Sequence, residues 1–212
     1  MIAHVIPLED LERDALTELV NIGMSRAASS LRKMVGEQVL LSVPALEVVT
    51  RGGAATLIRE RESGQVVAVR QDFEGIFSGR ALLIFPEANS LALVRAVTGG
   101  AISAEDAAEL EDEALAETGN VVLNSCLATM ANMLQQSLTM SLPEVIRSDG
   151  SSLFDLVENG VEEGVVLFLY INFAINDRNI RGYIAMLMDL PSLEALRLLI
   201  ADFIRRVVGD ET

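Results

Sequence analysis

One polar pattern occurs twice in this chain at a fixed interval, and it constrains the fold more than any other feature. In each copy an acid is followed four positions later by a second acid, and an asparagine and a proline come after it. The two copies are Asp14, Glu18, Asn21 and Pro44, and Glu113, Glu117, Asn120 and Pro143. Each residue of the first copy lies 99 positions before its counterpart. Four matches at one interval predict an internal duplication.

The elements predicted from the sequence follow the same order in both halves. The first half should contain a helix (8–34), an extended segment (37–50), a loop-like stretch (52–64), a hairpin (65–73 and 77–85) and a helix after Pro86. The second should contain a helix ending near 138, a strand around Pro143, a hairpin (165–175 and 182–190) and a helix after Pro191. Helices and hairpins in this order are typical of an α+β fold.

We therefore expect two pseudo-symmetric halves whose strands form antiparallel sheet, with the two long motif helices side by side and exposed on one face. No linker rich in Pro, Gly or Ser separates the halves. Residues 1–212 should thus form a single domain of two repeats, about 8–100 and about 104–209. A monomer is expected, because the duplication supplies internally what a one-copy protein would obtain by dimerising.

Composition excludes several classes of protein. The longest apolar run, 165–171, is far shorter than the roughly 20 residues of a membrane-spanning helix, and no signal peptide is evident, so we expect a cytoplasmic protein without membrane insertion. The chain contains a single cysteine, Cys126, and a single histidine, His4. An intramolecular disulfide, a multi-cysteine metal site and a histidine-based triad are therefore excluded. Cys126 should be an inert core thiol. We expect no metal or cofactor bound by this chain.

The net charge of −15 argues against nucleic-acid binding, which requires a basic surface. The charge has two open interpretations. It can serve solubility alone, or it can attract a partner that carries a lysine-rich patch.

The repeated triplet forms one narrow stripe on a helix, since positions 0, 4 and 7 point within about 60° of one another. Such a stripe can simply be the solvated face of an amphipathic helix. A mid-helix asparagine at the same place in both halves favours a function, because asparagine is a poor helix former. Its carboxamide cannot act as a general base, but it can hold a water in line for attack on phosphorus. A neighbouring glutamate can pair with a lysine.

No phosphate-binding GxxxxGK[ST] loop or Gly-rich dinucleotide fingerprint is present. An active centre built on the stripe would therefore be completed by a partner protein. The pattern [Asp/Ser]-x3-Glu-x2-Asn-x22-Pro resembles the signature of the CheC/CheX/FliY phosphatases of bacterial chemotaxis. The segments LVNIGMSRAASSL and SVPALEVV resemble that family's motif helix and following strand. Two copies in 212 residues are similar to the two-motif CheC type.

The resemblance implies hydrolysis of the phospho-aspartate of a CheY-type response regulator, with Mg²⁺ held by the regulator and CheD as a second candidate partner. The roles it implies come in pairs: Asn21 and Asn120 position the water, Glu18 and Glu117 pair with the regulator's lysine, Asp14 and Glu113 support them, and Pro44 and Pro143 are structural. The chain departs from the pattern at Glu113, which is one methylene longer than the usual Asp. We expect both sites to act, and the first is the safer assignment.

Two other functions stay open. The chain can be a non-catalytic module that binds the phosphorylated regulator or CheD, as a FliM-like domain without the Glu-x2-Asn signature would. It can also be a general acidic interaction protein. The two intact Glu-x2-Asn pairs favour the phosphatase, because docking alone does not require asparagine.

Overall fold

The computed structural model describes residues 8–97, 110–150, 152–154, 164–175 and 178–209. Its helices are α1 (Asp10–Val35), α2 (Arg51–Arg61), α3 (Ser90–Val97), α5 (Glu111–Met133) and α6 (Leu190–Gly209), with 3-10 turns η1 (Glu87–Asn89) and η2 (Ser152–Phe154). Its strands are β1 (Val39–Thr50), β2 (Val66–Gly75), β3 (Gly79–Pro86), β4 (Leu138–Met140), β5 (Glu144–Ser148), β6 (Gly164–Ile175) and β7 (Arg178–Asp189).

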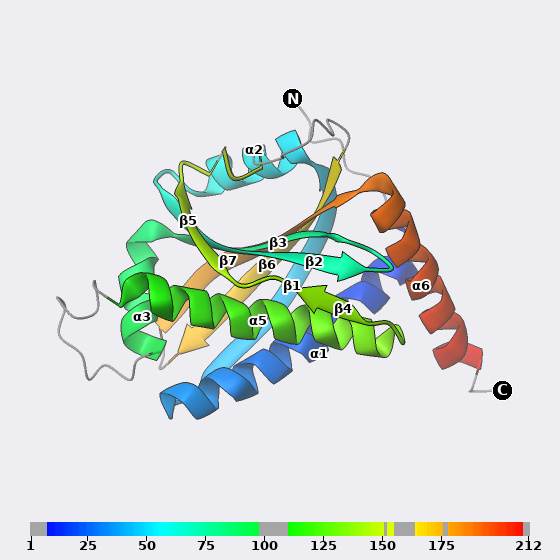
Figure 1. Cartoon of the computed structure of the whole chain (residues 1–212), viewed down its shortest axis with the longest axis horizontal. Helices are drawn as coiled ribbons and strands as arrows, with labels where there is room; N and C mark the ends of the chain where they lie inside the picture. The colour runs from blue at the N-terminus through cyan, green and yellow to red at the C-terminus, as the bar shows by residue number, and fades with distance from the viewer. Residues whose placement is uncertain (1–7, 98–109, 151, 155–163, 176–177, 210–212) are drawn as a thin grey trace.

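All the described strands belong to one antiparallel sheet, in the order β1-β6-β7-β3-β2-β4, with β5 also paired to β2. The strands lie between α2 on one side and α1 and α5 on the other (Figure 1). The larger apolar core fills the space between the sheet and α1, α3, α5 and α6, and a smaller one lies under α2. The predicted α+β class is confirmed.

The two motif helices pack against each other closely and run in opposite directions (Figure 1). Their contact depends on Gly23, where an added methyl carbon would lie 2.8 Å from the Cα of Cys126. Gly119 has a similar role between α5 and β2, because a methyl carbon there would lie 2.4 Å from Val69. Both helices were predicted to lie side by side with their polar stripes exposed, and they do.

The strand order is symmetric: exchanging β1 with β5, β2 with β6 and β3 with β7 gives the same order in reverse. The register agrees to within one residue: Ala45 pairs with Tyr170, and Glu144, which lies 99 residues after Ala45, pairs with Arg70, which lies 100 residues before Tyr170. This symmetry supports the predicted duplication, which stays a prediction. The joint between the predicted repeats, residues 98–109, lies outside the described residues.

Some expectations about the elements were wrong. The strand expected around Pro143 is divided there into β4 and β5. The loop-like stretch 52–64 contains most of α2, because the hydroxyl of Thr50 accepts from the Gly53 N–H at the helix start and Ala54 and Ile58 are buried one turn apart. Helix α5 ends at Met133 instead of near 138. The chain turns there through Gln135, which has a φ of 57°, and enters β4.

Candidate functional site

The motif acids lie on the exposed faces of α1 and α5, as predicted. Asp14, Glu18, Glu113 and Glu117 are exposed. Among the residues that the structure describes, no arginine or lysine lies within ion-pair distance of any of these four carboxylates. Neighbouring acids differ in this respect, since Glu12 pairs with Arg197 of α6 at 3.3 Å. The motif acids are therefore free to meet a cation from outside the chain.

Asn21 is half-buried and held by the backbone of β1. Its Oδ1 accepts from the N–H of Val43 at 2.9 Å, and its Nδ2 donates to the C=O of Val43 at 3.1 Å. Val43 lies directly before Pro44, in an interruption of the β1–β6 register between Ser42 and Ala45. The interval between Asn21 and Pro44 thus has a physical meaning. It brings a carboxamide to backbone groups that the irregular register leaves without a strand partner.

This double contact fixes the orientation of the Asn21 carboxamide, because each of its two ends matches one backbone group. A carboxamide has two N–H donors and two lone pairs on its oxygen. Val43 uses one of each. One donor and one acceptor of Asn21 remain for a water or a partner.

Asn120 has a different set of contacts. Its Oδ1 accepts from Nε2 of Gln71 at 3.2 Å and from Nδ2 of Asn124 at 2.6 Å, so both lone pairs of the oxygen are used. Its own Nδ2 has no hydrogen-bond partner in the described part of the chain. The two motif asparagines therefore offer different groups. Asn21 retains an acceptor, whereas Asn120 offers donors alone.

Gln71 links Asn120 to the strand break that contains Pro143. Its Nε2 also donates to the C=O of Ser141 at 2.8 Å, and Pro143 lies between β4 and β5. Gln71 is fully buried, and its Oε1 has no partner among the described residues. Gln71 was not predicted from the sequence. The sequence does contain one indication of it: Gln71 is a polar residue at an inward-facing position of β2, between the apolar residues Val69 and Phe73.

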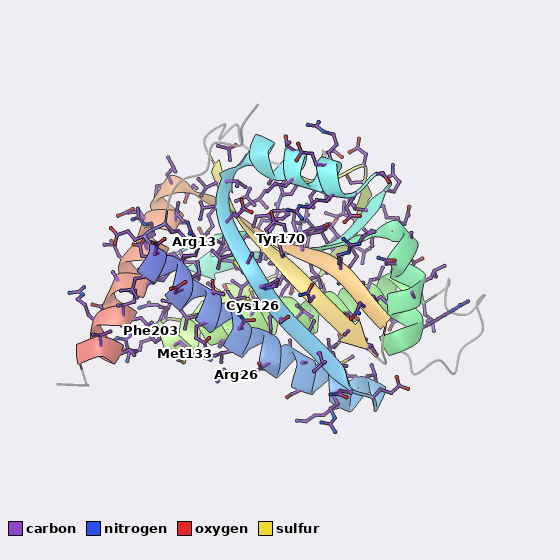
Figure 2. The ribbon with its side chains drawn as sticks, turned by 180° about the vertical axis from the view of Figure 1, so that it is seen from behind. Arg13, Arg26, Cys126, Met133, Tyr170 and Phe203 are labelled. Carbon is purple, nitrogen blue, oxygen red and sulfur yellow. The ribbon has the colours of Figure 1, made fainter. Side chains whose placement is uncertain are left out.

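Cys126 lies at the α1–α5 contact and is fully buried (Figure 2). Burial raises the pKa of its thiol to about 12, so the thiol stays protonated at neutral pH. The prediction of a core thiol is confirmed. Arg26 of α1 donates from Nη1 to the Thr129 hydroxyl of α5 at 3.1 Å and so bridges the two helices.

Within the described residues, no three His, Cys, Asp or Glu side chains come close enough to hold a metal ion. The helices described here include none with the length and apolar character needed to cross a bilayer. The arrangement can present a carboxylate and an oriented carboxamide one turn apart on an exposed helix. A reacting group would have to be brought to them by another molecule.

Comparisons with known proteins find similar sequences and a similar fold. The model of the CheC-like family matches residues 11–48, which hold the whole first motif. "CheY-P phosphatase CheC" of Bacillus subtilis is 24% identical over 199 residues, covering 89% of this chain and 93% of that protein. The chain is thus similar to the CheC/CheX/FliY family along nearly its whole length. "Flagellar motor switch phosphatase FliY" of the same species is 25% identical over 146 residues, which cover 68% of this chain and 38% of that protein.

The fold is also that of a solved family member. The crystal structure of Thermotoga maritima FliY superposes with a TM-score of 0.71 at 16% identity, over 93% of this chain and all of that one. At this identity the likeness shows the shared fold and nothing about the individual site residues.

Proposed function

We propose that this chain is a phosphatase that hydrolyses the phospho-aspartate of a CheY-type response regulator. The relatives named above that align with it are both named phosphatases, and one of them, named for CheY-P, aligns along nearly its full length. The observation that carries the proposal is the pairing of an exposed Glu18 with an Asn21 whose carboxamide is fixed in orientation. Mg²⁺ is expected on the regulator, and CheD, the monomeric state and the cytoplasmic location stay predictions.

Glu18 and Glu117 are proposed to pair with a lysine of the regulator. Both are exposed and unpaired in the described structure, so docking breaks no internal ion pair. A contact of this kind contributes less than about 1 kcal/mol when exposed to solvent, and where docking excludes water the cost of desolvating both charges offsets much of their attraction. Asp14 and Glu113, one turn earlier, would add to the same negative stripe.

Asn21 is proposed to position the attacking water. A water that donates one hydrogen to the free lone pair of Oδ1 has its oxygen directed away from the helix, toward a phosphoryl group held there by the regulator. Attack forms a bond from that oxygen to phosphorus and breaks the bond from phosphorus to the aspartate oxygen, which leaves as a carboxylate. The protons of the water leave with the inorganic phosphate or pass to solvent. Positioning of this kind lowers a barrier by several kcal/mol without a general base.

The second motif is expected to be the weaker one in this conformation. Both lone pairs of the Asn120 oxygen are used by Gln71 and Asn124, so a water cannot donate to it unless one contact opens. Position 25 of the first copy, which corresponds to Asn124, is Ser25. Asn124→Ser should therefore free one lone pair and raise the activity of the second motif.

The test is the rate of phosphate loss from a phosphorylated CheY-type regulator of the same genome, with Mg²⁺ controlled. Wild type is compared with Asn21→Ala, Asn120→Ala, the double variant and Asn132→Ala, which removes an exposed α5 asparagine outside the motif. We expect Asn21→Ala to lose most of the activity, Asn132→Ala to lose none, and the double variant to retain binding without turnover. Adding Asn124→Ser to Asn21→Ala should restore part of the rate.

The same experiment decides the alternative of a non-catalytic binding module. A wild-type chain that binds the phosphorylated regulator and leaves its dephosphorylation rate unchanged would reject the enzyme. The motif would then serve docking alone.

A further inference from the structure

A pocket of about 460 Å³ lies on the side of the sheet away from the motif helices, where β1, β6, β7 and the end of α2 meet. Six of its lining residues carry the chemistry: Pro44, Arg61, Tyr170, Asn172, Arg181 and Tyr183. In Figure 2 Tyr170 lies near α2, apart from Cys126 and Arg26 on the helix layer. The function proposed above uses none of these side chains except Pro44.

The aromatic walls of the pocket are fixed by hydrogen bonds. The hydroxyl of Tyr170 donates to Oε1 of Glu47 at 2.8 Å, and the hydroxyl of Tyr183 donates to Glu62. The two ring centroids are 6.2 Å apart at 72°, an edge-to-face pair. Burial and these carboxylates raise the pKa of both hydroxyls, so the rings stay neutral at physiological pH. The walls therefore need little rearrangement to receive a ligand.

The pocket also brings positive charge to a strongly acidic protein. Arg61 lies with its guanidinium carbon 4.4 Å from the Tyr170 ring centroid, and Arg181 lines the same space. Both are exposed, and neither forms an ion pair with a carboxylate of the described chain. Glu47, the acid that lines the pocket, has one oxygen engaged by Tyr170. Glu62, beside the pocket, is likewise engaged by the hydroxyl of Tyr183. Two exposed guanidinium groups that no described carboxylate pairs with, beside two carboxylates that each accept from a tyrosine, favour an anionic guest.

Guanidinium groups bind carboxylate and phosphate oxygens in bidentate fashion, and tyrosine rings contact planar groups. The exposed amide of Asn172 adds a donor and an acceptor. We propose that this pocket binds a small organic anion with a planar body and a phosphate or carboxylate group, and that occupancy acts on the first motif.

The pocket and the first motif are connected through adjacent residues of β1. Val43 belongs to the core under α1, whereas Pro44 and Ala45 both line the pocket, because the irregular register of β1 directs two consecutive residues to that face. A ligand that contacts Pro44 is thus next to the backbone amide that holds Asn21. An effect of the ligand on phosphatase activity rests on the proposed function. The two physical steps, binding of the ligand and movement of Val43, do not rest on it.

Binding can be followed without a label, because the whole chain contains two tyrosines and no tryptophan, and both tyrosines line this pocket. Phenyl phosphate is the probe, with inorganic phosphate and phenol as its separate halves. We expect a saturable change in tyrosine fluorescence with phenyl phosphate and a weaker affinity for either half. Arg181→Gln should weaken binding at least about tenfold, which corresponds to about 1.4 kcal/mol.

Arg59→Gln is the matched control, because Arg59 is an exposed arginine of α2 outside the pocket. The site is rejected if phenyl phosphate gives no saturable change, or if Arg59→Gln weakens it as much as Arg181→Gln. The second step is tested by hydrogen exchange at the Val43 amide, which should change when the probe binds. An unchanged Val43 with a filled pocket rejects the coupling. Neither measurement needs phosphatase activity, so failure of the proposed function would be recognised separately.

Discussion

Replacing Asn21 with alanine should destabilise the fold more than replacing Asn120, although the two occupy the same motif position. Asn21→Ala removes the partner of both the N–H and the C=O of Val43, a residue that is 2% exposed. Each backbone group left unsatisfied costs about 1–3 kcal/mol. Because the Asn21 site is half-buried, water replaces part of the loss. We expect Asn21→Ala to lower the free energy of unfolding by about 2–4 kcal/mol.

Asn120→Ala leaves fewer hydrogen-bonding groups without a partner. Nε2 of Gln71 keeps its bond to the C=O of Ser141 at 2.8 Å, and Asn124 is half-buried, so water can reach its freed amide. Side-chain hydrogen bonds of this kind contribute about 0.5–1.5 kcal/mol each when lost to solvent. We expect a loss of about 1 kcal/mol for Asn120→Ala.

Urea unfolding followed by circular dichroism measures this difference, with Asn132→Ala as the control for removing an asparagine from an exposed helix. The midpoints should fall in the order Asn132→Ala, Asn120→Ala, Asn21→Ala at a constant slope. In thermal unfolding each kcal/mol corresponds to a shift of about 2–4 °C for a chain of this length. Equal midpoints for the two motif variants, or a lower one for Asn120→Ala, would refute the reasoning from the Val43 contacts.

Three further predictions concern the core and the pocket. Gly23→Ala should cost about 1–3 kcal/mol by forcing α1 from α5, whereas Gly52→Ala, whose methyl group meets no described atom within 4 Å, should be neutral or stabilising in the same unfolding assay. The pKa of the Cys126 thiol is about 9 in the unfolded chain and about 12 in the folded one, so its contribution to the free energy of unfolding is complete below pH 9 and is lost as the pH rises toward 12. Raising the pH from 8 to about 10.5 should therefore lower the free energy of unfolding by about 2 kcal/mol in wild type and by less in Cys126→Ala. Tyrosine absorbance should show no ionisation near pH 10, because burial raises the pKa of Tyr170 to about 12. Glu47→Gln should lower the pKa of Tyr170.

Periodicity predicted the helix faces and hairpins because burial has a local signature in sequence. Leu16, Leu19 and Val20 recur at helical spacing and are all buried, while Asp14 and Glu18 are exposed. Helix α2 was missed because glycines and charges dominate its sequence. Its stability comes from a cap and from contacts with β1 and β6 that no local pattern records.

The sequence indicated the candidate site residues but not the hydrogen bonds that hold them. The stripe and the interval to Pro44 were visible in the sequence, yet the pairing of Asn21 with Val43 depends on an irregularity in the strand that only the folded sheet reveals. Gln71 was missed for a related reason. It lies 49 residues from Asn120, and the strand break at Ser141 determines which side chain reaches the motif.

The two motif copies place similar sequences in unequal hydrogen-bond environments. In the first half the edge strand β1 stays continuous, so its irregular residue Val43 can present both N–H and C=O to Asn21. In the second half the corresponding strand is divided into β4 and β5, and Gln71 reaches into the gap and occupies the oxygen of Asn120. A carboxamide can orient a water only through an oxygen that is free to accept. If the chain has the proposed activity, the state of the edge strand beside each motif, more than the motif residues themselves, should determine which half is active.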